Sequence, residues 1–119
     1  METQVDERMV ELLTETGLNR NIAKVVAFLA KVGEAVSRDI ERAANLRQPE
    51  VSLAMKELKE LGWVKERELK KKGKGRPLKS YKLTRELKEI VAELVTKKKE
   101  EIKKIEKDLE ELESIAGLR

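Results

Sequence analysis

Cationic side chains with evident chemistry are concentrated between Lys65 and Lys82. This segment has a net charge of +7, whereas the whole chain of 119 residues carries only +4. Clustered Lys and Arg side chains neutralise phosphate groups and release their counterions, which gives a salt-dependent affinity for nucleic acid. A solvated loop without a partner is the alternative. Seven residues of this segment are predicted to contact DNA: Arg67, Lys70, Lys71, Lys72, Lys74, Arg76 and Lys79.

One face of a helix that is predicted to begin near Pro49 is the second candidate surface. Its core face is predicted from apolar residues at helical spacing, Val51, Ala54, Met55 and Leu58. Its other face, with the preceding turn, would present six residues to DNA: Arg47, Gln48, Glu50, Ser52, Leu53 and Lys56. In a major groove, Gln48 could pair with adenine, Glu50 with cytosine and Leu53 with a thymine methyl group, while the other three suit phosphates. An ordinary solvated helix face is the alternative.

Short helices and a hairpin must position these two surfaces. A first helix is predicted to end at Gly17, a second to run from an Asn19 cap to Gly33, and a third to begin at a Ser37 cap. The fourth is the helix near Pro49, which should stop at Gly62. Besides the four residues above, the core is expected to contain Leu61 and the stripe of the second helix, Ile22, Val25, Val26, Leu29 and Val32. Val5, Met9, Leu12 and Leu13 lie at helical spacing in the first helix, and the third helix carries Ile40, Ala43 and Ala44.

The sequence after Gly62 changes from helical to strand-like patterning. Residues 63–69 and 78–83 read as two strands of a hairpin with a long basic tip. Thr84 is predicted to cap a final helix that runs to about Ser114. The far half of that helix carries a narrow apolar stripe at spacings of 3, 4 and 3, which is typical of a coiled coil and predicts pairing with a second copy. The predicted dimer contacts are Leu94, Ile102, Ile105, Leu109 and Leu112.

This order of elements resembles the winged helix-turn-helix domain of archaeal and bacterial transcription regulators, including MarR, ArsR and TrmB-like proteins. The resemblance spans residues 19–84 and is carried by four segments: 37–40, 51–58, 62–64 and 75–84. It implies a mainly α fold with a small β-hairpin, and sequence-selective binding of double-stranded DNA by a homodimer. The expected domains are an N-terminal helix (1–18), the DNA-binding domain (19–84) and a long dimerisation helix (85–119).

The composition removes most other classes of function. The chain has no Cys and no His, which excludes thiol nucleophiles, imidazole bases and almost every zinc site. No paired carboxylates stand out, so we expect neither an enzyme nor a cofactor, and a small-molecule effector is not indicated. The longest apolar stretch, Val25 to Ala30, is too short to cross a bilayer, which favours a cytoplasmic protein. Abundant Glu and Lys resemble hyperthermophile composition.

Two further functions compete with a sequence-selective regulator. The chain could be a winged-helix docking module in transcription or replication machinery, with the long helix bound to a different protein. It could also be an architectural protein that binds DNA with little regard to sequence. The salt dependence of DNA binding distinguishes a regulator from a docking module. The ratio of specific to non-specific affinity distinguishes a regulator from an architectural protein.

Overall fold

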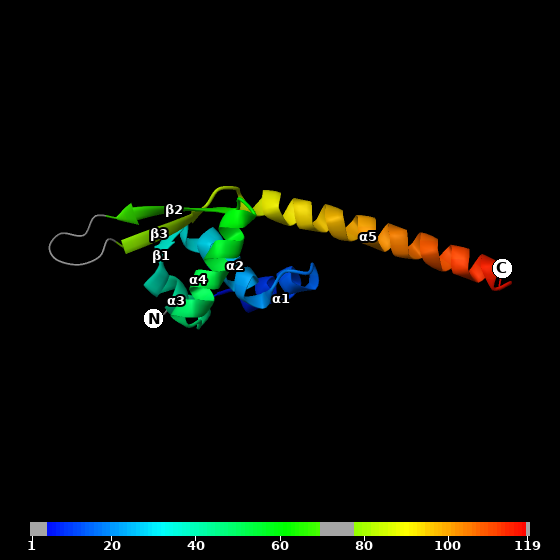
Figure 1. Cartoon of the computed structure of the whole chain (residues 1–119), viewed down its shortest axis with the longest axis horizontal. Coiled ribbons are helices and arrows are strands. Elements are labelled where there is room, and N and C mark those ends of the chain that lie inside the picture. The colour runs from blue at the N-terminus through cyan, green and yellow to red at the C-terminus, as the bar shows by residue number, and fades with distance from the viewer. Residues whose placement is uncertain (1–4, 70–77, 119) are drawn as a thin grey trace. The chain divides into compact units, whose positions relative to one another are not determined.

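The computed structural model describes residues 5–69 and 78–118, which form five helices and three strands (Figure 1). The chain divides into two compact units, residues 1–87 and 88–119, and each is described by itself. In chain order the elements are α1 (Glu7–Glu15), α2 (Arg20–Val32), β1 (Glu34–Val36), α3 (Ser37–Ala44), α4 (Gln48–Glu60), β2 (Val64–Leu69), β3 (Leu78–Leu83) and α5 (Leu87–Ile115).

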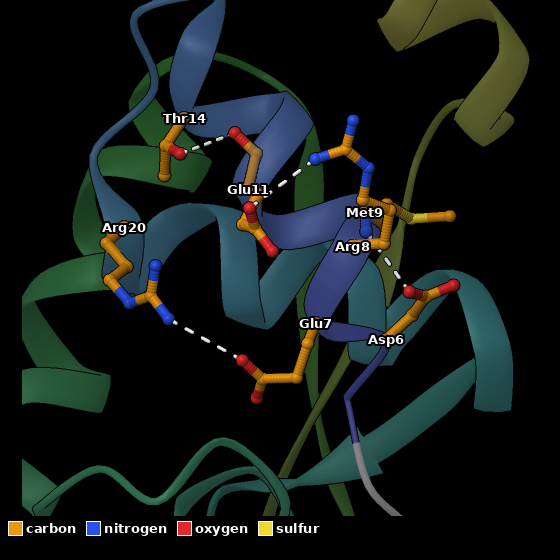
Figure 2. Close-up of polar contacts among 7 residues, drawn as sticks. All are labelled: Asp6, Glu7, Arg8, Met9, Glu11, Thr14 and Arg20. Atoms are coloured by element: carbon orange, nitrogen blue, oxygen red, sulfur yellow. Dashed lines mark hydrogen bonds and ion pairs between the residues drawn. The ribbon is translucent and has the colours of Figure 1, made fainter.

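The first two helices begin at side-chain caps. The Asp6 carboxylate accepts a hydrogen bond from the backbone N–H of Met9 (3.1 Å), and an ion pair of 3.7 Å joins Arg20 at the start of α2 to Glu7 at the start of α1 (Figure 2). Asn19 caps α2 as predicted, because its side chain accepts from the N–H of Asn21 (2.8 Å). The two cap hydrogen bonds, from Met9 and Asn21, satisfy backbone donors that a helix leaves unpaired at its first turn.

The predicted Ser37 cap of α3 is wrong. Val36 occupies the N-cap position and makes no side-chain cap bond, while Ser37 is the first helical residue. The reason is β1, a three-residue strand that local patterning did not predict. Val36 pairs with Ser80 in the sheet, which holds its backbone extended (φ −87°, ψ 160°) until the helix begins.

The core of the first unit surrounds α2, which packs against α1, α3, α4 and the sheet. The predicted inner face of α4 is confirmed, since Val51, Ala54, Met55 and Leu58 are all buried. Two predicted core residues are wrong: Val32 and Leu61 are 41% and 52% exposed. Val32 and Leu61 lie at helix ends, where the chain leaves the core. Leu12 faces outward because Val10 and Leu13 form the buried side of α1.

The strands form one antiparallel sheet in the order β1-β3-β2. The hairpin of β2 and β3 confirms the prediction within one residue, although Trp63 precedes β2 as a buried residue. Neighbouring residues of β3 point to opposite faces, and Tyr81 and Ser80 are both buried. The predicted Thr84 cap is wrong, because its hydroxyl donates to the Gly62 carbonyl (2.5 Å) and α5 begins three residues later.

The second unit is built on one unbroken helix, α5, of 29 residues. Its end at Ile115 agrees with the prediction to within one residue. Ile90 and Leu94 are buried in the single chain, and the assignment of Leu94 to a dimer contact stays a prediction. The other four predicted contacts are exposed. Among the helices of residues 5–69 and 78–118, none is long and apolar enough to cross a membrane.

Candidate nucleic-acid interface

The outer face of α4 presents the six side chains that the sequence analysis assigned to DNA. Arg47, Gln48, Glu50, Ser52, Leu53 and Lys56 are all exposed. Leu53 is notable because 59% of its surface faces solvent in the middle of an otherwise polar helix face. Since the opposite face is buried in the core, the fold holds this surface rigidly. No contact to a base is tested by this arrangement, and the six assignments stay predictions.

Three of these side chains form hydrogen bonds within α4. Glu50 accepts a hydrogen bond from the backbone N–H of Arg47 (2.8 Å) and so caps the start of the helix. The Gln48 amide donates to the Ser52 hydroxyl at 3.3 Å. The position of Glu50, three residues after the cap position, is the sequence signal for this role. The capping bond uses one acceptor site of the carboxylate, and the other sites stay available for the predicted cytosine contact.

The outer face of the three-stranded sheet is the second part of the interface. The register places Lys65 of β2 and Glu34 of β1 on either side of Lys82 of β3. Two pairs further along, on the same face, Arg67 lies opposite Ser80. These strands surround a shallow depression of about 470 Å³, lined by Glu34, Lys65, Glu66, Arg67 and Lys82.

Arg67 is neutralised on this face by a carboxylate. Its Nε donates to Glu34 Oε2 at 2.6 Å and its Nη2 to Oε1 at 3.2 Å, a bidentate pair. The buried Ser80 hydroxyl donates to the same Oε2 at 2.7 Å. The hydrogen bonds from Arg67 and then Ser80 lower the pKa of Glu34 to about 2. Arg67, which was predicted to contact DNA as a free cation, is therefore committed to an ion pair in the structure.

Lys79 also shares a carboxylate. Glu66 accepts from Lys59 of α4 at 2.8 Å and forms an ion pair of 3.7 Å with Lys79. The Lys59 hydrogen bond lowers the pKa of Glu66, and the same bond raises the pKa of Lys59. This cluster joins the C-terminal part of α4 to β2. The nearby Glu66 carboxylate offsets part of the attraction of Lys79 for an external anion.

Lys65 and Lys82 are cations that the sequence analysis did not select. They lie directly opposite each other on β2 and β3 and are exposed. Within residues 5–69 and 78–118, neither forms an ion pair with a carboxylate. Like charges directly opposite each other in a sheet repel. A bound anion would reduce the repulsion between Lys65 and Lys82. Strand alternation with Arg67 is the sequence signal that places Lys65 on this face.

The other predicted contacts of the hairpin lie outside the described residues: Lys70, Lys71, Lys72, Lys74 and Arg76. Among the described residues, the candidate interface therefore consists of the outer face of α4 and the outer face of the sheet. The first is polar with one exposed leucine, and the second carries paired and unpaired cations.

Comparison with known proteins finds similarity at the level of structure. No protein-family model matches the chain, and neither does any curated protein. The chain resembles TrmBL2, described as an archaeal chromatin protein with a novel mode of DNA binding (TM-score 0.56, 23% identity, 92% of this chain and 42% of that one). It also resembles NMB1585, a MarR family regulator from Neisseria meningitidis (TM-score 0.53, 23% identity, 80% of this chain and 65% of that one).

A third similar structure is that of NadR in complex with 4-hydroxyphenylacetate (TM-score 0.51, 23% identity, 93% of this chain and 81% of that one). The chain thus spans less than half the length of TrmBL2 and about two thirds of NMB1585. The similarity includes the order of the helices and the small antiparallel sheet. With its mainly helical first unit, three-stranded sheet and long final helix, the chain has the winged-helix fold of the MarR-like regulators.

Proposed function

We propose that the chain is a transcription regulator that binds double-stranded DNA as a homodimer and selects its sites by sequence. The exposed outer face of α4 carries this proposal, because it combines hydrogen-bonding side chains with one apolar side chain on a rigid helix. A major groove admits such a helix and offers it base edges and thymine methyl groups. The winged-helix fold and the DNA-associated neighbours support it. A DNA partner would place the protein in the cytoplasm.

The basic segment between Lys65 and Lys82 would supply the part of the affinity that does not depend on sequence. Its cations would lie along the backbone or in the minor groove, where phosphates attract them. Lys65 and Lys82 join this set because neither forms an ion pair with a carboxylate among the described residues, although Lys82 lies opposite Glu34 in the sheet. Arg67 contributes less, since Glu34 already holds it.

An architectural protein with little sequence preference is the second candidate. The observation that favours it is the similarity to TrmBL2, which is described as a chromatin protein. The two candidates share every cationic contact and differ in the role of the α4 face. A regulator needs that face to discriminate between bases, whereas an architectural protein does not.

Selection of bound fragments from random duplex DNA tests the proposal. A regulator enriches a motif and binds it at least about a thousandfold more tightly than random duplex. An architectural protein binds both duplexes alike, and a docking module binds neither. Light scattering on the same sample reports whether the bound species is a dimer.

The salt dependence of binding tests the cationic contacts separately. Replacing Lys74 and Arg76 by Ala should lower the slope of log affinity against log salt by up to about 2, because each lost phosphate contact removes about 0.9. The matched control is the double variant Glu34→Gln with Arg67→Gln, which leaves the net charge unchanged. It should keep the wild-type slope. A clear fall in the slope of the control would show that Arg67 leaves Glu34 to bind phosphate.

A further inference from the structure

The far half of α5 carries an exposed apolar stripe. Ile102, Ile105, Leu109 and Leu112 are 52%, 56%, 54% and 61% exposed. Their spacings of 3, 4 and 3 are those of the a and d positions of a heptad. From the charges around this stripe we infer that it binds the same stripe of a second copy in antiparallel orientation. This inference rests on the proposed homodimer and adds its orientation.

The charge along this part of α5 is strongly polarised. Residues 97–104 contain five Lys and two Glu, a net charge of +3, whereas residues 110–117 contain three Glu and no basic residue, a net charge of −3. A parallel pair in register would place each segment beside its own copy, so that like charges meet along the whole length. An antiparallel pair places the basic segment of each copy beside the acidic segment of the other. Opposite charges then meet at both ends.

The apolar stripe fits the antiparallel arrangement in one register. With the two-fold axis at Lys107, Ile102 lies opposite Leu112 of the second copy, and Ile105 lies opposite Leu109. Every a position of the stripe then packs against a d position, and all four apolar layers are filled. The aligned segments are 97–104 and 110–117, so the register chosen by the apolar residues is also the one that matches the charges.

The residues that flank the stripe also favour the antiparallel orientation. All four e and g positions from 101 to 113 are acidic: Glu101, Glu106, Asp108 and Glu113. In a parallel pair, Glu101 would face Glu106 and Asp108 would face Glu113, each contact occurring twice. In the antiparallel pair, Lys99 faces Glu113 twice, and two acidic pairs remain at the axis. One of these involves Asp108, whose charge is partly offset by Lys104 at 3.2 Å in the same helix.

This orientation sets how far apart the two α5 helices begin. Leu87 lies 20 residues from the axis at Lys107, so the two helix starts are separated by about 60 Å along the axis, at 1.5 Å per residue. A parallel pair would place the two starts side by side. The separation between equivalent residues is therefore the quantity to measure.

Spin labels on the full chain measure it without disturbing the stripe. The chain has no native Cys, so Thr96→Cys gives one label at an exposed position. The antiparallel pair predicts an axial separation of about 33 Å between the two labels, and the parallel pair predicts labels within about 20 Å. Ser114→Cys supplies a second value, about 21 Å along the axis in the antiparallel pair. A short distance at Thr96, or a monomer by light scattering without DNA, would overturn the inference.

Charge reversal provides an independent test. Replacing Lys97, Lys98 and Lys99 by Glu should weaken the dimer by about tenfold or more at low salt, because acidic segments then meet. Adding Glu110→Lys, Glu111→Lys and Glu113→Lys to the same chain should restore dimerisation, and Lys107→Glu on the outer face is the control. A parallel dimer would be indifferent to the first triple change. Duplex binding measured on the same variants keeps a failure of this orientation distinct from a failure of the DNA-binding proposal.

Discussion

Replacement of Leu53 by Ala is the sharpest test of the α4 face. Leu53 is exposed on the side of the helix away from the core, so the change should leave the folded state almost untouched. We expect the free energy of unfolding to change by less than about 0.5 kcal/mol, as for most surface substitutions. Any loss of DNA affinity would then report on a contact to DNA.

The size of that loss follows from the exposed surface. Leu53 is 59% exposed in the free protein. Complete burial of a leucine stabilises by about 1.5–3 kcal/mol, so covering this remaining surface against a thymine methyl group is worth about 1–1.8 kcal/mol. Ala keeps part of that contact, and the expected loss is about 1 kcal/mol, or roughly fivefold in the dissociation constant.

Fluorescence anisotropy with two labelled duplexes measures the effect. One duplex carries the motif enriched by selection, and the other has a scrambled sequence. The fivefold loss should appear only on the first duplex, because phosphate contacts are common to both. Leu12→Ala is the matched control, since Leu12 is 51% exposed on α1. An equal loss for both variants, or unchanged binding of Leu53→Ala, would refute a role of this side chain in base recognition.

Three further predictions concern the fold. Glu34 has a pKa of about 2 in the folded protein against an ordinary value of 4.5, so its stabilising effect is complete above pH 4.5 and is lost as the pH falls through 2. Urea unfolding at pH 7 and pH 3 should therefore show a smaller drop in the free energy of unfolding for Glu34→Gln than for the wild type. Gly62→Ala should lower the free energy of unfolding by about 1–2 kcal/mol through the positive φ of 77° alone, because an added Cβ meets no atom within 4 Å. A Gly62→Asn variant that loses as much stability would contradict this. Leu58→Ala, in the core, should lose about 2–5 kcal/mol in the same assay.

Most of the fold could be predicted because its signals are local. Apolar residues three and four apart located α2, α4 and α5, and Asn19, Gly33 and Gly62 marked their ends. The prediction failed where contacts between residues far apart in the sequence determine the local structure. β1 has only three residues and exists because β3 offers it a free edge, so no pattern within residues 34–36 reveals it. That strand in turn moved the start of α3 away from the expected cap.

The candidate site was predictable in one half only. The exposed face of α4 follows from the helical period, and the structure places all six of its residues as expected. The sheet half depends on pairs that are remote in sequence: Glu34 meets Arg67 across 33 residues and Ser80 across 46. A charge count over a window of the chain cannot include such partners. The capping role of Glu50 was local and could have been read from its position.

The net charge of +7 between residues 65 and 82 therefore overstates what this hairpin can offer to DNA. Glu34 lies outside that window and neutralises Arg67 within it, while Glu66 divides its charge between Lys59 and Lys79. On the described part of the hairpin, we expect Lys65 and Lys82 to contribute most of the attraction for phosphate, although Lys82 also lies opposite Glu34. Lys65→Gln should thus lower the salt slope by about 0.9. The neutral Glu34→Gln, Arg67→Gln pair, on the same face, should leave it unchanged, because an ion pair that is satisfied within the fold releases no counterion from DNA.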